Sequence, residues 1–218
     1  EVSDAPVDKV DAGTETVDPK KVAVGVSSAA SRVKCGEDMR LVAAGAFMMG
    51  TGAGDPMTGF DEKPLTQVEL GAYCIDTFEY PNQRGDQPMA AVSYGDAAAL
   101  CAKTGKRLCK ESEWEKACKG AKANRWPYGN EYDVSACNSE SEGGDARKIA
   151  ASGQFAQCRS AYGVFDLSGN LGEWTADQQI KGGSFASGDY AVRCSARKSG
   201  ASASKSSEVG FRCCSDLK

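Results

Sequence analysis

One stretch decides how this chain folds: Tyr162-Gly163-Val164-Phe165-Asp166-Leu167-Ser168-Gly169-Asn170-Leu171-Gly172-Glu173-Trp174. Its first residues belong to a longer segment, residues 124–170, that is rich in Gly, Asn, Ser and Asp. This segment is far longer than an ordinary connection between elements. A segment of this kind in a compact domain usually carries function or bound ions. We therefore expect long ordered loops, with the functional residues placed on them.

Two helices are predicted before this stretch. The first has Ser93 as its N-cap with Asp96 in the capping-box position, and it stops at Gly105. The second covers about residues 111–118 and stops at Gly120. Strands are predicted over residues 41–49 and 67–78, where apolar side chains recur at strand spacing. These elements together predict a domain of the α+β class.

Ten cysteines and no histidine set the chemistry that is open to the chain. All ten lie between Cys35 and Cys214, and the chain begins at Glu1, so we expect a processed protein with five disulfides. The expected location is extracellular or on the cell surface, with the periplasm also open, and the signal peptide already removed. Without an imidazole, Ser-His-Asp triads, Cys-His pairs and histidine-based zinc or iron sites are excluded.

Charge and hydropathy exclude two classes of partner. The formal net charge is −4 and the isoelectric point is about 5.1, so no basic stripe for nucleic acid is expected. No apolar run approaches the length of a membrane span.

Composition divides the chain into an N-terminal arm, residues 1–34, and a domain, residues 35–218. The arm has no aromatic residue and no cysteine, which is typical of a segment that does not order alone. Within it, Val22, Val24 and Val26 alternate like a short strand that can pair with an open sheet edge. That edge belongs either to the arm's own domain or to a neighbouring subunit, and the second case predicts a homo-oligomer or filament.

Eight fragments of the sequence occur in the order of one known family. They are Ala44-Gly45-Ala46-Phe47-Met48-Met49-Gly50, Val92-Ser93, Gly105-Lys106-Arg107-Leu108, Glu113-Trp114-Glu115, Tyr128-Gly129-Asn130, the opening stretch, Gly182-Gly183-Ser184-Phe185 and Gly210-Phe211-Arg212-Cys213. In this order they resemble the formylglycine-generating enzyme family, also called the sulfatase-modifying-factor family. The resemblance implies a variant of the C-type lectin fold, with two helices, short antiparallel strands and long ordered loops.

The resemblance also implies two disulfides, Cys101–Cys213 and Cys118–Cys194. Three further pairs are our own inference: Cys35 with Cys74, Cys137 with Cys158, and Cys109 with Cys214. The adjacent cysteines 213 and 214 point to opposite faces of a strand and can serve different partners. Other pairings among cysteines 101, 109, 213 and 214 stay open at this level.

The catalytic residues of the family are not matched. Formylglycine-generating enzymes bind copper(I) through two cysteines, at positions that correspond here to Ser187 and, approximately, Val192. A hydroxyl and an isopropyl group cannot replace the soft thiolates that copper(I) prefers. Related iron-dependent enzymes of this fold use histidine ligands, which this chain lacks. We therefore expect no copper, no iron and neither family reaction.

The positions that bind calcium in this family are matched better than its copper-binding positions. Asp166, Gly169, Leu171 and Glu173 match family positions that give Ca²⁺ two side-chain oxygens and two backbone carbonyls, and oxygen ligands suit this cation. The alternative is a solvated Gly-Asn turn. A second, weaker site is suggested by Asn138, the Ser139 carbonyl and Asp145.

Two classes of function follow. The first is a non-catalytic exported module, which either joins a homopolymer through the arm or binds a protein or glycan ligand through a variable C-terminal loop, residues 199–207. The second is an enzyme, either a formylglycine-generating-type oxidase or one of different chemistry. An enzyme should show a perturbed acid-base cluster in its groove, whereas a binding module should not.

Overall fold

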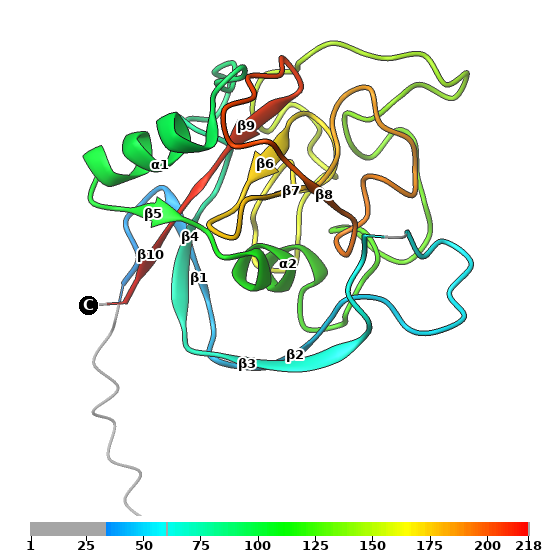
Figure 1. Ribbon diagram of the computed structural model, residues 1–218, viewed down its shortest axis with the longest axis horizontal. Helices are drawn as coiled ribbons and strands as arrows, with labels where there is room; N and C mark the ends of the chain where they lie inside the picture. The colour runs from blue at the N-terminus through cyan, green and yellow to red at the C-terminus, as the bar shows by residue number, and fades with distance from the viewer. Residues whose placement is uncertain (1–33, 60, 218) are drawn as a thin grey trace, which may run out of the picture. The chain divides into compact units, whose positions relative to one another are not determined.

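The computed structural model describes residues 34–59 and 61–217 (Figure 1). Val22, Val24 and Val26 therefore lie outside the described residues, and the docking strand stays a prediction. The described elements are two helices, α1 (Tyr94–Lys103) and α2 (Glu111–Lys119), and ten short strands. The strands are β1 (Met39–Val42), β2 (Gly45–Met49), β3 (Thr66–Leu70), β4 (Tyr73–Asp76), β5 (Arg107–Leu108), β6 (Gly172–Trp174), β7 (Gln179–Lys181), β8 (Arg197–Ser199), β9 (Val209–Phe211) and β10 (Cys213–Asp216).

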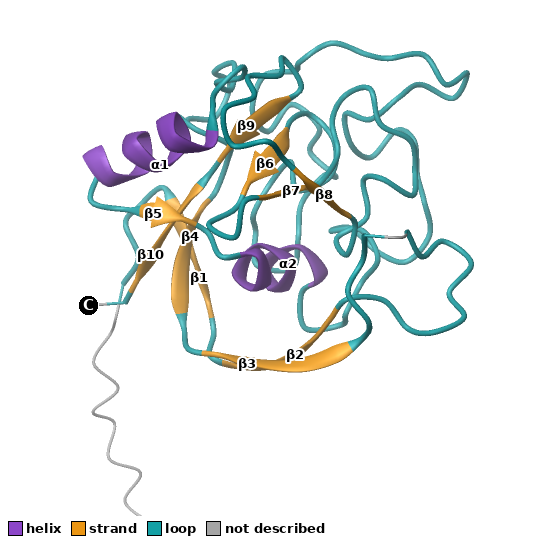
Figure 2. Cartoon of the chain, in the orientation of Figure 1, coloured by secondary structure: helices purple, strands orange, loops and turns teal. Residues whose placement is uncertain are grey.

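The strands form three sheets. One has the order β1-β4-β10-β5, the second is the β2-β3 ribbon, and the third has the order β8-β7-β6-β9. All pairs are antiparallel except β6 with β9. β9 and β10 follow each other directly, so the end of the chain joins the first sheet to the third (Figure 1). Loops make up most of the rest, as Figure 2 shows, which agrees with the predicted α+β fold of this family.

Both predicted helices are confirmed, and their ends follow from local chemistry. The Ser93 side chain accepts a hydrogen bond from the Asp96 N–H, while Asp96 reaches back to the backbone of Ser93. This reciprocal capping satisfies two N–H groups that the first turn leaves without partners. α2 ends at Gly120, whose φ of 63° lies in the left-handed region that glycine adopts without strain.

The two predicted strands are each divided in two. The segment 41–49 forms β1 and β2, and the segment 67–78 forms β3 and β4. Val42 pairs with Tyr73 in the first sheet, and Gly45 pairs with Leu70 in the ribbon. Both segments therefore leave the first sheet at matching positions and continue as the separate β2-β3 ribbon. Gly45 has a φ of 131°, which a side chain would disfavour. The sequence pattern shows alternation on both sides of this bend but not the bend itself.

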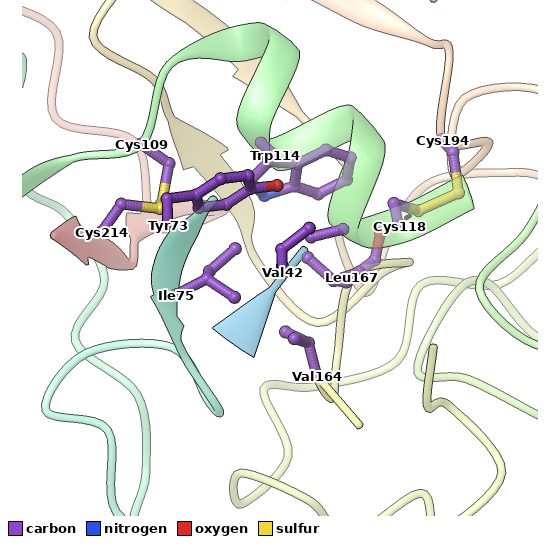
Figure 3. Close-up of a cluster of buried hydrophobic side chains, with 11 residues drawn as sticks. Val42, Tyr73, Ile75, Cys109, Trp114, Cys118, Val164, Leu167, Cys194 and Cys214 are labelled. Carbon is purple, nitrogen blue, oxygen red and sulfur yellow. Dashed lines mark hydrogen bonds between the residues drawn. A yellow bond between two sulfur atoms is a disulfide. The ribbon is translucent and has the colours of Figure 1, made fainter. Parts of the chain in front are cut away.

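Two packed clusters make up the core. The first surrounds Trp114 of α2 and includes Tyr73, Ile75, Leu167 and Cys214 (Figure 3). The second surrounds Trp174 and Phe211 and includes Cys101 and Cys213 of α1 and β10. Trp126 is buried as well, so all three tryptophans belong to the interior rather than to an exposed sugar-binding platform. Burial of such large aromatic side chains is a major source of stability.

Five disulfides join the ten cysteines. They are Cys35–Cys74, Cys101–Cys213, Cys109–Cys214, Cys118–Cys194 and Cys137–Cys158. The pairing agrees with both the implied and the inferred bonds. Cys213 faces the second cluster and Cys214 the first, which removes the ambiguity between them. This number of disulfides indicates folding in an oxidising compartment. Neither described helix has the length and apolar character to cross a bilayer.

Candidate functional site

A groove of about 1110 Å³ opens beside the third sheet. Its floor is the segment that follows β7, residues 182–187, together with Trp174 and Ile180. One wall is the loop 56–62 and another is β8 with the serine-rich segment that follows it. Pockets with an apolar base and a few polar groups on the rim are the usual form of a binding site. The groove is therefore the candidate functional site.

The two positions that the resemblance assigns to copper-binding cysteines, Ser187 and approximately Val192, lie close together, and Ser187 lines the groove. A Cβ atom placed on Gly183 would lie 3.1 Å from the Ser187 Cβ and 2.8 Å from a Val192 methyl carbon. Ser187 and Val192 thus both lie beside Gly183, whose φ is 64°. The fold brings the two positions together, but the side chains there are a hydroxyl and an isopropyl group. All ten cysteines are in disulfides, so no free thiol is left to replace them.

Hydrogen bonds already use the hydroxyl groups of the floor. The Ser184 N–H donates to the Ser187 Oγ at 2.9 Å, and the two hydroxyl oxygens are 3.2 Å apart. The Ser184 hydroxyl donates to Glu208 Oε2 at 2.7 Å. This row of hydrogen bonds, from Glu208 through Ser184 to Ser187, connects the floor to the far wall. It resembles a proton relay in outline, but an imidazole base is missing from the sequence.

Ion pairs fasten the loop 56–62 over the groove. Arg193, which is buried, pairs with Glu62, and its guanidinium also donates to the Met57 carbonyl. Arg125 pairs with Asp55 at 2.8 Å near the beginning of the same loop. Because a buried pair is lost only at a high energetic cost, Arg193 holds this wall in place.

β8 forms the other wall. It pairs with β7 on one side only, so it is the edge strand of the third sheet. Gly200 follows it and lies on the indole of Trp174, where an added Cβ would be 2.2 Å from a ring carbon. No residue with a side chain fits at this position without movement, so glycine is required for the wall to approach the floor. The serine-rich segment 199–207 thereby becomes a lining of the groove.

Behind the groove lies a buried acidic cluster of Glu79, Asp166 and Glu173, with the cation Arg212. Arg212 is fully buried and grips Glu173 through two hydrogen bonds of 2.7 and 2.6 Å. Glu173 Oε2, which accepts the 2.7 Å bond from Arg212 Nε, also accepts from the Trp114 indole N–H at 2.7 Å. Glu79 accepts from the Asn170 side chain at 2.7 Å and from the Leu171 N–H at 3.0 Å. The four charges link the loop 166–171 to β6 and to the end of the chain.

Burial perturbs the acids of this cluster. Burial raises the pKa of Asp166 to about 6, although the Gly153 N–H and Arg212 act in the opposite direction. Burial also raises the pKa of Glu79 well above its ordinary value, with the neighbouring Asp166 and Glu173 carboxylates adding to the effect. These groups lie in the interior behind the groove floor, so their perturbation reports a structural network.

Two of the predicted calcium ligands, Asp166 and Glu173, belong to this buried cluster. Asp166 and Glu173 are both buried, and the Glu173 carboxylate adds to the effect of burial in raising the pKa of Asp166. However, both Glu173 oxygens already accept hydrogen bonds, from Arg212 and Trp114. An ion held by all four predicted residues would have to share the Glu173 carboxylate with Arg212. The calcium site at Asp166, Gly169, Leu171 and Glu173 therefore stays a prediction.

The residues of the second predicted calcium site differ in their burial. Asn138 is buried and its amide donates to the Lys148 carbonyl and to Asn170, whereas Asp145 is exposed. Ser139, whose carbonyl was the third ligand, is buried beside Asn138. Among the residues that the structure describes, no group of three or more His, Cys, Asp or Glu side chains is placed to hold a metal ion.

Calcium binding is tested by thermal stability. If the predicted site at Asp166 holds Ca²⁺, millimolar calcium is expected to raise the melting temperature of the wild type by a small amount, because a ligand of the folded state stabilises it. Asp166→Ala should remove the increase, and magnesium at the same concentration serves as the control. An unchanged melting temperature in the wild type would mean that Arg212 alone neutralises the cluster.

Sequence reasoning missed the role of Arg212 and of Glu79. Arg212 was noted only as part of a family fragment, yet it carries the charge balance of the interior. A signal was available, because this arginine stands alone among Phe211, Cys213 and Cys214 in a strand-like apolar run. A charged residue in such a run has to find a buried partner. Glu79 had no comparable signal.

Comparison with known proteins agrees with this geometry. The family described as "Sulfatase-modifying factor enzyme 1-like domain" matches residues 79–217. A formylglycine-generating enzyme of Bos taurus is 31% identical over 172 residues, which cover 61% of this chain and 45% of the relative. A Bos taurus protein named "Inactive C-alpha-formylglycine-generating enzyme 2" is 33% identical over 150 residues, which cover 59% and 50%. The chain spans about half the length of these curated relatives.

Two solved structures share the fold. PvdO from Pseudomonas aeruginosa superposes with a TM-score of 0.70 at 23% identity, covering 82% of this chain and 94% of that one. Treponema denticola variable protein 1 gives a TM-score of 0.67 at 17% identity, with the same coverage. The names of the relatives include an enzyme and a protein described as inactive, so the matches by themselves leave the catalytic status open.

Proposed function

The chain belongs to the sulfatase-modifying factor enzyme 1-like family, and from this premise we propose that it is a non-catalytic, exported module that binds an extended polypeptide in its groove. One observation carries the proposal. Ser187, which lines the groove, and the buried Val192 lie beside Gly183, and the resemblance to formylglycine-generating enzymes implies copper-binding cysteines at Ser187 and approximately at Val192. The groove is retained while the ligands for its metal are replaced.

The lack of a substitute for those ligands supports a non-catalytic role. The chain has no histidine, and its cysteines are all in disulfides. Burial raises the pKa of Glu79 and Asp166, and both lie in the buried cluster around Arg212 rather than in the groove lining. A general acid or base has to reach a substrate, which an interior carboxyl cannot do.

The walls of the groove indicate an extended ligand. β8 leaves one side of its backbone without a strand partner and lines the groove at the same time. A peptide in extended conformation can add to such an edge, where backbone hydrogen bonds supply affinity and side chains enter adjacent pockets. The serine-rich segment after β8 offers small polar side chains along the same path.

The charges of the groove favour a ligand with a basic side chain. Three lining acids, Asp61, Asp189 and Glu208, lie without a cation within ion-pair distance among the described residues, against one such base, Lys198. Arg197 pairs with Glu111 and Glu62 pairs with Arg193, so neither contributes a free charge. A positive side chain near Glu208 would complement this surface.

Groove binding is tested with a matched pair of variants. Ala201→Trp fills the groove, whereas Ala121→Trp adds the same side chain at an exposed position after α2, outside the groove lining. A panel of fluorescent extended peptides with a central arginine, and the same panel with glutamate, would be titrated by anisotropy. We expect binding of the arginine panel, with Ala201→Trp weakening it about tenfold or more, a loss of about 1.4 kcal/mol.

Equal affinity of the two tryptophan variants would overturn the proposal, as would the absence of binding to every peptide. Assembly into a homopolymer through residues 1–34 stays a separate prediction, because those residues other than Lys34 lie outside the described part. A glycan ligand in the same groove would appear as displacement of peptide by sugar. Oxidation of a cysteine-containing peptide by the wild type would restore the enzymatic alternative.

A further inference from the structure

Three arginines from separate parts of the chain lie near Phe165 or the neighbouring Gly163, and none of them lines the groove. Arg40 belongs to β1, Arg84 to the loop after Pro81, and Arg159 follows Cys158. The guanidinium carbons of Arg84 and Arg159 each lie 5.5 Å from the centre of the Phe165 ring. We call Arg40, Arg84 and Arg159, together with Phe165, the arginine face.

Two of these guanidinium groups are direct neighbours. A Cβ atom placed on Gly163 would lie 3.2 Å from Arg159 Nη2 and 3.4 Å from Arg40 Nε. Both groups thus reach the same point above this glycine, whose φ of 80° disfavours a side chain. Two positive charges that approach the same point repel each other unless a negative charge lies between them.

The protein supplies no such charge within contact distance. Five other arginines each have a carboxylate partner within 4.0 Å: Arg107, Arg125, Arg193, Arg197 and Arg212. Within residues 34–59 and 61–217, no carboxylate lies that close to any arginine of the arginine face. The chain contains 30 acidic and 26 basic residues, so acids are not scarce. Arg84 and Arg159 are exposed and Arg40 is half-buried, so an anion from the solvent can reach all three.

The surroundings hold the arginines in position and leave hydrogen-bonding groups unused. Phe165 stacks on Phe78 with ring centres 5.2 Å apart, and this pair forms an aromatic base on which guanidinium groups bind well. The hydroxyl groups of Ser160 and Ser152 are buried and have no hydrogen-bond partner among the described residues. Ser160 is next to Arg159 and closes a turn with Gly163, and the Ser152 carbonyl accepts from the Gly85 N–H beside Arg84.

We propose that the arginine face binds a tetrahedral oxyanion group of the sulfate or phosphate class. Guanidinium forks match the oxygens of such groups, and a doubly charged anion between Arg40 and Arg159 would remove their repulsion. The group reaches the protein either as a dissolved ion or as an ester on a larger molecule. The site is separate from the groove, so the proposal does not depend on what the groove binds.

The test uses the full chain and compares anions at matched ionic strength. Melting temperatures would be measured in sodium chloride, sodium sulfate and sodium phosphate, and affinity for a heparin-derived oligosaccharide would be compared with that for unsulfated dextran. We expect sulfate or phosphate to raise the melting temperature above that in chloride. Tighter binding of the sulfated oligosaccharide than of free sulfate would identify an ester as the ligand, and the reverse would identify the ion.

Variants decide whether the arginine face is responsible. Arg40→Gln/Arg159→Gln should weaken anion binding about tenfold or more. Lys122→Gln, which removes a positive charge at an exposed position after α2, should leave it unchanged. Arg84→Gln on its exposed loop serves as a second variant if the double substitution impairs folding. The proposal is overturned if sulfate and phosphate act no differently from chloride, or if the folded arginine variants bind as the wild type does.

Discussion

Replacing Ser187 and Val192 by cysteine is expected to create a copper(I) site in a protein whose groove floor now lacks thiols. Both positions lie beside Gly183, and we expect two thiolates placed there to contact one ion. Thiolates are the ligands that copper(I) selects. The double variant should therefore bind one copper(I) per chain under anaerobic conditions, measured by titration against a competing chelator. The wild type should bind none at the same chelator concentration.

The single variants Ser187→Cys and Val192→Cys are the matched controls, since each provides only one thiolate. Thiol titration of the denatured double variant would show that the two new cysteines are free and that the five existing disulfides are intact. A folded double variant with two free thiols and no affinity for copper(I) would contradict the assignment of these positions. The inference that the groove lost only its metal ligands would then fail.

Replacing Arg212 by glutamine is expected to cost about 3–5 kcal/mol of unfolding free energy, because it leaves buried carboxylates without their cation. Arg212 is fully buried and bonds both oxygens of Glu173, which is also fully buried. Glu79 and Asp166 lie in the same cluster and lose the same compensating charge. Chemical denaturation with the disulfides intact would measure the loss.

The loss of unfolding free energy in Arg212→Gln is expected to depend on pH. In the wild type, the pKa of Asp166 is about 6 in the folded state against an ordinary value of 3.8. The folded state thus binds more protons between these values, and this group's contribution to stability falls as pH rises through that window. Removal of Arg212 raises the pKa of the buried acids further. The deficit of Arg212→Gln should therefore be smaller at low pH than at neutral pH.

A surface arginine provides the comparison. Arg125 pairs with Asp55 at 2.8 Å, but its side chain is 41% exposed. Its replacement by glutamine should change the unfolding free energy by about 1 kcal/mol or less, since water screens such a pair. Equal losses for Arg125→Gln and Arg212→Gln, or a deficit for Arg212→Gln that does not vary with pH, would contradict the role given to the buried cluster.

The sequence by itself determined the elements that depend on local chemistry. The Ser93–Asp96 capping box and Gly120 define helix ends through contacts between residues a few positions apart, and both were predicted correctly. The family fragments determined the fold and two of the disulfides. The even cysteine count, with no histidine, determined that redox and acid-base chemistry would be restricted.

Only the tertiary structure decided the features that rest on distant residues. The bend at Gly45 depends on β1 and β2 pairing with two different strands in two different sheets. Glu173 matches a calcium ligand by spacing, yet its carboxylate is held by an arginine 39 residues further along the chain. Arg40 and Arg159 meet at Gly163 although 119 positions of the printed sequence separate them. Spacing along a sequence shows which residue types share one turn or strand. The partner of a buried charge depends instead on how distant elements pack together, and no local pattern encodes that packing.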